Sequence, residues 1–371
     1  MRHAAALLAL VAALPAAAEP AAWEPETTWA VLVGILEWKD PALAPFPKEN
    51  RQDRAFEAAL KSAGVPAAQI VFLEDAAATL PAIRKALRET AEKAPEGSTL
   101  IFYFAGHGLQ ADGGAVAFAN HECDTKRQAE TAFAVTDLVR IVDRNFKGSR
   151  VLLTADCCYS GGLAKAVTEL GKSRAAACLT SATACNVSTG RWTFTESLVA
   201  LFSADGTLDA DADGVVTFRE ADAHIAARMR FLEGQLTRGV VAGSFDREFR
   251  FLAIPPERAA KTVPGPWRIG SWCEVEWKKD WFRAEVLDGR EGEWKVRYLG
   301  FGAEWDEWVP AKRIRRPTGI AVAAGAAVKV EWKGKWYPAK VMQVEDDFAF
   351  VHYDGYGNEW DEWVTAKRLK K

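Results

Sequence analysis

The sequence is poor in three features that would each point to a broad class of protein. Its formal net charge is only −3 over 371 residues, so no excess of positive charge indicates nucleic acid or an anionic membrane surface as the partner. Beyond the N-terminal segment no run is long and apolar enough to cross a bilayer, which takes about 20 residues. No C-x-x-C pair occurs, and the adjacent Cys157 and Cys158 would form a disulfide only with strain, which argues against a thiol-redox protein.

The first 18 residues have the pattern of a secretory signal peptide. Arg2 and His3 precede an apolar run over residues 4–14, and Ala16 to Ala18 match an A-x-A cleavage site. We therefore predict a secreted or periplasmic protein, with an uncleaved anchor as the alternative. Export would place the six cysteines in an oxidising compartment, but the sequence does not assign disulfides, and reduced buried thiols remain the other possibility.

Two stretches carry candidate catalytic residues at predicted strand ends. The run VLLTADCCYSGG (residues 151–162) begins as a buried strand and ends at glycines, with Cys157 and Cys158 at its carboxyl end. Upstream, TLIFYF (residues 99–104) leads directly into Ala-Gly-His107-Gly. If these strands are neighbours in a parallel sheet, a thiol and an imidazole meet at one edge, as a Cys–His nucleophilic catalyst requires.

The two motifs together resemble those of the caspase and metacaspase superfamily of cysteine peptidases. YFAGHG is followed by D-x-C-x-S-G, which here reads Asp156-Cys157-Cys158-Tyr159-Ser160-Gly161. The resemblance runs from about Trp29 to Ile254. It implies that Cys158 is the nucleophile and His107 its partner, while Cys157 stands where the family usually has Ser or Ala.

The resemblance also implies an oxyanion site and a specificity pocket. Backbone N–H groups of Gly108 and Cys158 would hold the oxyanion. Asp156 matches the metacaspase position that receives a basic side chain, so cleavage after Arg or Lys is expected. The family's second pocket acid falls on Gln52, with Asp53 one residue late; either Asp53 compensates or the pocket has one acid. The alternative function is an inactive caspase-like scaffold.

Alternating predicted strands and helices independently indicate an α/β sandwich with a mainly parallel sheet over residues 28–255. The predicted strands are residues 28–35, 69–73, 99–104, 151–155 and 175–182, with residues 248–254 as a closing edge strand and residues 115–120 as a small hairpin excursion. The predicted helices are residues 51–63, 80–91, 135–145, 193–202 and 218–230.

An acidic loop at residues 209–220 has the spacing of an EF-hand calcium loop. Asp209, Asp211 and Asp213 stand at ligand positions one, three and five, and Gly214 supplies the sharp turn. The remaining ligand positions fall on the Val215 carbonyl, Thr217 and Glu220. We predict Ca²⁺ binding there; a metal-free acidic turn is the alternative.

The composition changes after a Pro-rich linker at residues 256–267, and an internal repeat follows. Residues 268–316 and 323–371 align without a gap, including EWDEWV at 304–309 and again at 359–364. Their alternating polar and apolar residues predict two small β-barrels, and the pattern resembles Tudor and chromo-barrel modules. Those families bind methylated side chains, peptides or nucleic acid.

Two interpretations of the barrel aromatics stay open from the sequence. They form an aromatic site that attracts a cation, or they simply make up the core of each barrel. The linker also predicts that the barrels fold separately and hold a substrate, a peptide partner or an envelope component without contributing to the chemistry.

Overall fold

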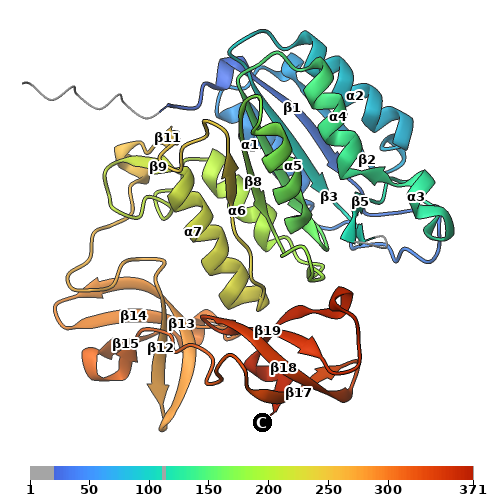
Figure 1. The fold of residues 1–371 in the computed structure, drawn as a ribbon. Coiled ribbons are helices and arrows are strands. Elements are labelled where there is room, and N and C mark those ends of the chain that lie inside the picture. The colour runs from blue at the N-terminus through green and yellow to red at the C-terminus, as the bar shows by residue number, and fades with distance from the viewer. Residues whose placement is uncertain (1–20, 111–113, 371) are drawn as a thin grey trace, which may run out of the picture.

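The computed structural model describes residues 21–110 and 114–370; the predicted signal peptide at residues 1–18 lies outside them. The described chain forms an α/β domain followed by two small β-domains that pack beneath it (Figure 1). No helix in these described ranges is long and apolar enough to cross a membrane. All six cysteines lie within them and are free thiols.

A six-stranded sheet forms the centre of the α/β domain, in the order β10-β8-β7-β3-β1-β2. Five strands pair in parallel and only β10 is antiparallel to its neighbour β8. The bounds are β1 (Thr28–Gly34), β2 (Ile70–Glu74), β3 (Thr99–Ala105), β7 (Arg150–Asp156), β8 (Ala175–Thr180) and β10 (Val240–Ala242). Strand β3 is buried along its whole length, as expected for a parallel sheet covered on both faces.

Helices cover both faces of this sheet (Figure 1). One apolar cluster joins the sheet to α1 (Gln52–Ser62), α6 (Thr193–Phe202) and α7 (Phe218–Arg228). The other joins it to α2 (Leu80–Lys93), α4 (Val135–Asn145) and α5 (Leu163–Leu170). The predicted three-layer sandwich with a mainly parallel sheet is therefore confirmed.

Two smaller sheets flank the central one. The predicted excursion is confirmed as β4 (Gly108–Gln110) and β5 (Val116–Phe118), which pair with each other and with β6 (Phe133–Ala134). A four-residue helix, α3 (Gln128–Thr131), precedes β6.

The prediction for the closing edge strand is wrong. Strand β11 (Arg250–Ala253) pairs with β9 (Val215–Thr217), which follows the acidic loop, and the edge of the central sheet is β10 instead. The apolar side chains of β11 pack under α6 and α7, so its pattern indicated burial correctly but not the pairing partner. Helix α5 was not predicted, because it is only eight residues long and begins immediately after two glycines.

The C-terminal repeats form two five-stranded antiparallel sheets with the same strand order. Barrel 1 contains β12 (Trp272–Trp277), β13 (Asp280–Arg290), β14 (Glu293–Tyr298), β15 (Glu307–Pro310) and β16 (Ile314–Arg315). Barrel 2 contains β17 (Ala327–Trp332), β18 (Lys335–Glu345), β19 (Phe348–Tyr353), β20 (Glu362–Thr365) and β21 (Leu369–Lys370). Equivalent small apolar residues fill both cores, such as Val275 with Val330 and Ala284 with Ala339, which confirms the barrel prediction.

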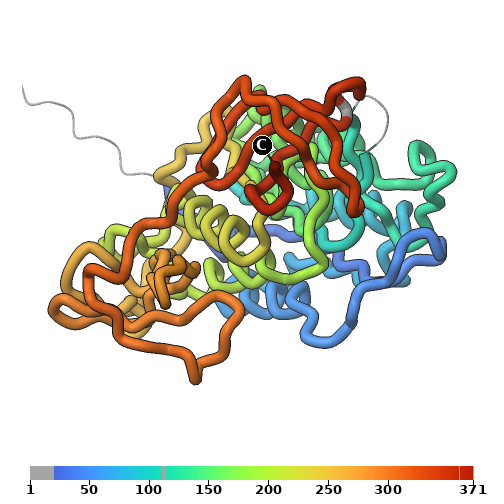
Figure 2. The backbone as a smooth tube through the Cα atoms, turned by 90° about the horizontal axis from the view of Figure 1, so that it is seen from below, coloured from blue at the N-terminus to red at the C-terminus, as the bar shows by residue number. Residues whose placement is uncertain are grey.

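The barrels are docked against the α/β domain and against each other, and barrel 2 lies across it when viewed from below (Figure 2). Buried Asp347 at the end of β18 accepts from Arg230 of the α/β domain (3.0 Å) and from Arg283 of barrel 1 (2.7 Å). Phe231 stacks on Trp272 of barrel 1, with ring centroids 5.1 Å apart. Three units thus meet at one buried charge cluster, which a flexible tether would not produce.

Candidate active site

The pairing of β3 with β7 brings the two sequence motifs together. These strands are adjacent and parallel, and Ala105 lies opposite Asp156 in the register. His107 and Cys158 each follow their strand by two residues, so both leave the sheet at the same carboxyl-terminal edge. The interpretation that their strands are sheet neighbours is therefore confirmed.

Cys158 is half-buried, and its thiol contacts the β8–α6 loop (residues 181–192). The Ser188 N–H donates to Cys158 Sγ at 3.2 Å. Burial raises the pKa of the Cys158 thiol, and the Ser188 N–H partly offsets this by stabilising the thiolate. Cys157 is buried completely, and burial raises its thiol pKa well above the usual value, so of the two adjacent cysteines Cys158 is the more readily ionised.

His107 is held by a backbone carbonyl and by two aromatic rings. Its Nε2 donates to the Ala44 carbonyl oxygen at 2.8 Å, which leaves Nδ1 as the acceptor of the neutral imidazole. The ring lies 4.4 Å from Trp38 and 4.6 Å from Phe46 between centroids. Burial lowers the imidazole pKa, so the ring is neutral near pH 7 and able to take up a proton.

Ala44 is a functional position that sequence reasoning missed. Its contribution is a main-chain carbonyl, so residue type carries no signal for it. Within the part of the chain that the structure describes, no hydrogen bond joins His107 to Cys158 Sγ. The structure thus shows an oriented imidazole and a thiol, the candidate base and the candidate nucleophile, on one sheet edge without a preformed bond between them.

Gly108 approaches the backbone of Cys158 closely. A Cβ at Gly108 would lie 1.8 Å from the Cys158 carbonyl oxygen, so only glycine fits. The Ala119 N–H donates to the His107 carbonyl at 3.0 Å. Because alternate residues of an antiparallel pair turn their backbone groups to the same side, the Gly108 N–H points away from β5. That orientation suits an oxyanion donor beside Cys158.

Asp156 lies in the wall of a cavity next to the nucleophile. The cavity measures about 260 Å³, and its lining includes Asp156, Cys157, Cys158, Ser188, Trp192 and Glu196. The Asp156 carboxylate accepts from Thr195 Oγ1 at 2.7 Å. Burial raises the pKa of Asp156 to about 7 despite the hydrogen bonds from Thr195.

Asp53 lies elsewhere. It is fully buried, and its carboxylate accepts from Arg51 Nη2 at 2.6 Å. Arg51 also donates to Asp75 at 2.7 Å, and these partners raise the Arg51 pKa although burial lowers it. Asp53 is not among the described residues that line the cavity. Its charge is already used by an internal ion pair. Of the two pocket acids that the resemblance implies, only Asp156 lines the cavity, where Glu49, Glu196 and Arg191 are also found.

The acidic loop folds as a compact turn between α6 and α7. Carboxylate oxygens of Asp209, Asp211 and Asp213 all lie within 4.8 Å of one another. Asp209 Oδ1 is buried and has no hydrogen-bond partner within the described residues. Gly214 adopts a φ of +87°. A buried carboxylate oxygen without a donor, next to two further carboxylates, fits a cation that prefers oxygen ligands.

Thr217 and Glu220 contribute differently from the three aspartates. They form the capping box at the start of α7, in which Glu220 Oε2 accepts from the Thr217 N–H at 2.9 Å. Glu220 Oε1 accepts from the Asp211 N–H at 3.3 Å. Pairing of Val215 with Ala253 in the β9–β11 ladder keeps the Val215 backbone next to the loop. The structure thus brings the three aspartate carboxylates together, with Glu220 bonded to the loop backbone. It does not show the Val215 carbonyl or Thr217 directed at the same point.

Each barrel carries a cluster of five aromatic rings at equivalent positions, which we call the aromatic clusters. In barrel 1 the members are Trp277, Phe282, Tyr298, Phe301 and Trp305; in barrel 2 they are Trp332, Tyr337, Tyr353, Tyr356 and Trp360. Trp305 is 49% exposed and Trp360 is 53% exposed. Tyr298 and Tyr353 belong to the barrel cores, so the core interpretation holds for them. The exposed Trp305 and Trp360 are not core, and these rings are the candidates for an aromatic site.

Comparison with known proteins agrees with the fold and the two motifs. The caspase domain family matches residues 27–250, more than half of the chain, and the chain belongs to this family. The Agenet domain family matches residues 272–318. The Tudor-knot family, described as an RNA binding activity-knot of a chromodomain, matches residues 322–371. These two matches coincide with the two barrels.

Solved structures give more distant similarities, and no curated protein matches the chain. The protein GSU0716 from Geobacter sulfurreducens is 14% identical, with a TM-score of 0.44, and the alignment covers 62% of this chain and 98% of that one. The AGD34 unit of Arabidopsis thaliana AGDP1 is 16% identical, with a TM-score of 0.14, and the alignment covers 27% of this chain and 79% of that one.

Proposed function

We propose that this protein is an exported cysteine endopeptidase of the caspase type that cleaves after Arg or Lys. The observation that carries the proposal is the pairing of Ala105 with Asp156, which places His107 and Cys158 beside each other at one sheet edge. A neutral imidazole oriented by Ala44 and a thiol at the rim of a cavity are the parts that nucleophilic catalysis needs.

In the proposed hydrolysis of the peptide bond, Cys158 is the nucleophile and His107 transfers the protons. The proton of Cys158 passes to Nδ1 of His107, and the thiolate attacks the scissile carbonyl carbon. The oxyanion accepts from the N–H groups of Gly108 and Cys158. The imidazolium then protonates the leaving amine as the C–N bond breaks, and water hydrolyses the thioester with His107 as base.

Asp156 supplies the basic preference of the proposed pocket. Its carboxylate lies in the cavity wall, and a guanidinium or ammonium entering the cavity would form a charge-assisted bond there. Such a partner favours the ionised carboxylate, so substrate binding lowers the raised pKa of Asp156. The substrate is accordingly a peptide or protein with a basic residue before the cleaved bond.

Covalent labelling tests the proposal most simply. A peptidyl-arginine acyloxymethyl ketone should alkylate Cys158 and no other cysteine, as read by peptide mass spectrometry. The matched peptidyl-aspartate ketone should react much more slowly. Labelling at Cys157, or equal labelling by the two reagents, would contradict the assignment.

Calcium is proposed as the cofactor of the acidic loop. Asp209, Asp211, Asp213 and Glu220 would supply carboxylate ligands, with the Val215 carbonyl and Thr217 completing the set. A bound ion would neutralise the crowded carboxylates and stabilise the start of α7. An extracellular or periplasmic location, which the N-terminal sequence supports, suits a site of modest affinity.

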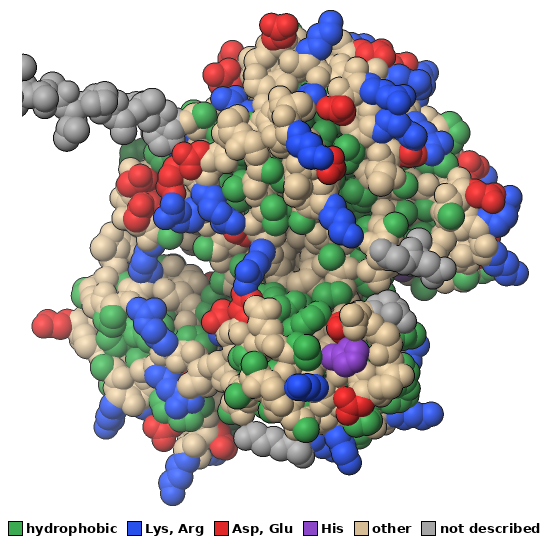
Figure 3. Space-filling model, in the orientation of Figure 1, with side chains coloured by type: hydrophobic (Ala, Val, Ile, Leu, Met, Phe, Trp, Pro, Cys, Tyr) green, Lys and Arg blue, Asp and Glu red, His purple; other side chains and the backbone are tan. Residues whose placement is uncertain are grey.

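The aromatic clusters make the barrels the proposed binding modules for a basic or methylated side chain of a peptide. Exposed Trp and Tyr rings attract such cations. Trp281 and Trp336 are less suited, because Arg315 and Lys370 already lie over them at 3.7 Å and 3.8 Å. Within the clusters, Lys278 lies over Trp277 at 4.4 Å and Arg368 over Trp332 at 5.4 Å, so the exposed Trp305 and Trp360 are the proposed contacts. Charges of both signs are mixed over the face shown in Figure 3, which with the net charge of −3 gives RNA little support as the ligand. A fluorescence titration tests this binding proposal. The Trp emission of the protein is followed as a trimethyllysine peptide is added, and the unmethylated peptide serves as the comparison.

The second candidate is an inactive scaffold whose barrels perform the binding. The observation that favours it is that His107 donates to Ala44 while the Cys158 thiol contacts Ser188. Labelling with the arginine ketone separates the two candidates: alkylation of Cys158 supports the peptidase, and no alkylation of Cys158 supports the scaffold.

A further inference from the structure

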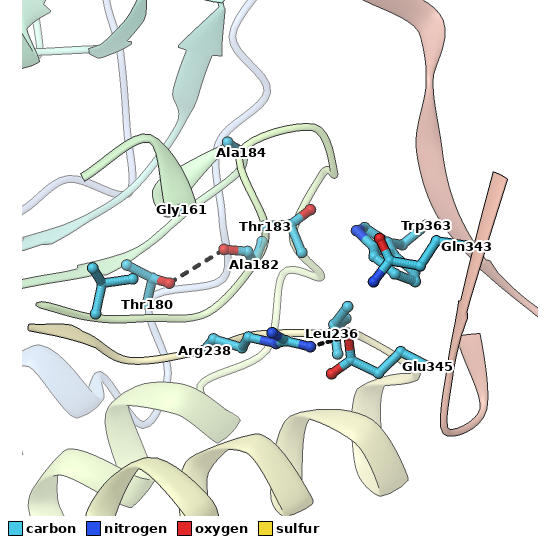
Figure 4. A pocket seen from close by; sticks show the side chains of 11 residues that line it. Gly161, Thr180, Ala182, Thr183, Ala184, Leu236, Arg238, Gln343, Glu345 and Trp363 are labelled. Carbon is cyan, nitrogen blue, oxygen red and sulfur yellow. Dashed lines mark hydrogen bonds and ion pairs between the residues drawn. The ribbon is translucent and has the colours of Figure 1, made fainter. Parts of the chain in front are cut away.

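Barrel 2 contacts the loop that carries the hydrogen-bond donor to the nucleophile. Figure 4 shows the interface: Gln343, Glu345 and Trp363 of barrel 2 face Thr183 and Arg238 of the caspase domain across a cavity. That cavity measures about 290 Å³. Arg238 is paired with Glu345. The β8–α6 loop therefore has the active-site cavity on one side and barrel 2 on the other.

Asn186 makes the most specific contact of this interface. Its Nδ2 donates to the Trp363 carbonyl at 2.9 Å, and its Oδ1 accepts from the Trp363 N–H at 3.2 Å. Trp363 belongs to β20, which is the edge strand of barrel 2. One side-chain amide thus satisfies both main-chain groups of an edge residue, as a neighbouring strand would do. Thr183 Oγ1 donates to the same Oδ1 at 2.7 Å and so fixes which way the amide faces.

The backbone of the same residue leads directly to Cys158. The Asn186 carbonyl accepts from the N–H of Tyr159, the residue after the nucleophile, at 2.9 Å. Two residues further on, the Ser188 N–H donates to Cys158 Sγ at 3.2 Å. Tyr159 adopts a φ of +57°, a left-handed conformation that a non-glycine residue keeps only when its surroundings hold it. The loop segment from Asn186 to Ser188 therefore connects barrel 2 with the backbone of Tyr159 and with the thiol of Cys158.

The rest of the loop is anchored to the caspase domain itself. Gln235 Nε2 donates to the Val187 carbonyl at 2.7 Å, and Thr189 Oγ1 donates to Glu233 at 2.9 Å. Between Thr183 and Val187, the Asn186 side chain supplies two bonds to the Trp363 backbone, and the Cys185 thiol also contacts this backbone. The loop is thus held from two directions. Val187 and Thr189, which flank Ser188, are anchored within the caspase domain, and Asn186 holds the stretch before them to barrel 2.

We propose that Asn186 is a positioning residue through which barrel 2 holds the β8–α6 loop against Cys158, so that the second barrel is part of the active site's support. This rests on the proposed peptidase function for its biological meaning. It replaces the expectation from the linker that the barrels contribute nothing to the chemistry. The physical basis of this contact is simple. The backbone N–H and carbonyl of an edge strand have fixed positions, and the Asn186 amide bonds to both of them.

The test measures the reactivity of the Cys158 thiol in the full chain, without a substrate. Iodoacetamide alkylation of Cys158 is followed by mass spectrometry between pH 5 and pH 10. The charged or titratable groups near this thiol are Asp156, Cys157, Tyr159, His107, Cys185, Glu362, Glu49, Arg191 and Glu196. None of these residues is replaced in the variants, although Thr183 and Asn186 are both partners of the Cys185 thiol. Alkylation of Cys185 is therefore followed in the same spectra, and a shift confined to Cys158 reports the loop.

Asn186→Ala should move the midpoint of Cys158 alkylation to higher pH, because the loop keeps its anchors at Val187 and Thr189 but, without barrel 2, presents the Ser188 N–H to the thiol less firmly. The rate at pH 7 should fall about tenfold, the effect of losing one hydrogen bond to a charged group. With the arginine peptide substrate, kcat should fall while KM changes little. Thr183→Val, which is nearly isosteric, should shift the midpoint less but in the same direction, and it keeps the test usable if Asn186→Ala does not fold.

Asn145→Ala is the matched control. Asn145 makes one side-chain bond to the backbone of its own helix, α4, so its alkylation profile should coincide with that of the unaltered protein. If the alkylation profiles of both Asn186→Ala and Thr183→Val also coincide with that of the unaltered protein, the proposal is overturned. A shifted profile in a protein that cleaves no peptide supports the positioning role and overturns only the proposed peptidase function.

Discussion

At the scale of single residues, the site depends on environments that the structure gives to ordinary side chains. Two adjacent cysteines have the same chemistry in the sequence, and both line the cavity, but Cys157 is buried in an apolar cluster whereas Cys158 is only half-buried. The difference in burial, rather than residue type, separates an inert thiol from a candidate nucleophile.

Cys157→Ser should therefore keep most of the peptidase activity. Its thiol lies in the core and donates nothing to the attack, so kcat/KM for an arginine peptide should stay within a few-fold of the unaltered protein. A buried hydroxyl in an apolar cluster should instead cost about 1–3 kcal/mol of stability. Activity assays and urea unfolding of the same sample separate these effects; a loss of activity as deep as that of Cys158→Ala would mean that Cys157 is the nucleophile.

The raised pKa of Asp156 predicts that the free energy of unfolding depends on pH. Its pKa is raised to about 7 in the folded chain by burial, whereas an unfolded Asp titrates near its ordinary value of about 4. Between these values the folded state holds a proton that the unfolded state has lost, so the contribution of Asp156 to stability falls as pH rises from about 4 to about 7. Asp156→Asn should remove this slope in urea unfolding. An unaltered slope would show that the carboxyl stays ionised.

At the scale of elements, α7 joins two regions of proposed function. Its N-terminus is capped by Thr217 and Glu220 of the acidic loop. Its C-terminal end continues as a π-helical turn (Met229–Glu233), in which Glu233 accepts from Thr189 of the β8–α6 loop. Because the acidic loop supplies the N-terminal cap of α7, a change in the conformation of this loop would affect the start of the helix.

Asp209→Asn should affect stability in opposite directions with and without calcium. Without the ion, the substitution removes one of three crowded carboxylates, so the melting temperature should stay equal or rise. With Ca²⁺ it removes a ligand, so the upward shift of a few degrees expected for the unaltered protein should shrink. Calorimetry in EDTA, Ca²⁺ and Mg²⁺ provides the comparison, with exposed Glu257→Gln as the control. Equal shifts by Ca²⁺ in both variants would count against the site.

Much of this organisation was predictable from the sequence, for physical reasons. The helices at residues 135–145 and 193–202 were predicted with their observed bounds, because each has one continuous apolar face. The three-residue strand β10 gave no such pattern, and it depends on pairing with β8 for its existence. His107 and Cys158 were found because residue type matters there. Ala44 and Asn186 were not found, because a carbonyl and an interface amide depend on tertiary placement.

At the scale of the whole molecule, the three folded units form one assembly and not a domain with a loose tail. Arg268 at the start of barrel 1 donates to the Asp209 carbonyl, while Asn186 joins barrel 2 to the nucleophile loop. The barrels therefore touch both the proposed calcium loop and the proposed active site. A ligand held by the aromatic clusters would act on a structure that is already in contact with the catalytic domain.

Asp347→Ala should loosen this assembly. The substitution removes the carboxylate that Arg230 and Arg283 share. Arg230 keeps its ion pair with Asp346 at 3.0 Å, and the Arg283 side chain is 35% exposed, so the loss of stability should stay below the about 3–5 kcal/mol of a fully buried pair. Tryptic cleavage between residues 256 and 267 should become faster, as followed by gel electrophoresis. Asp354→Ala, an exposed position on the same barrel, should leave the rate unchanged. Equal rates for both variants would show that the cluster does not hold the barrels.

The central claim is that Cys158 and His107 cleave peptides after a basic residue. Hydrolysis of a fluorogenic peptide ending in Arg, by the mature protein with Ca²⁺ present, tests it most directly. We expect activity that falls by orders of magnitude in both Cys158→Ala and His107→Ala, with little hydrolysis of the matched peptide ending in Asp. Equal activity in Cys158→Ala, or hydrolysis of the Asp peptide alone, would contradict the account.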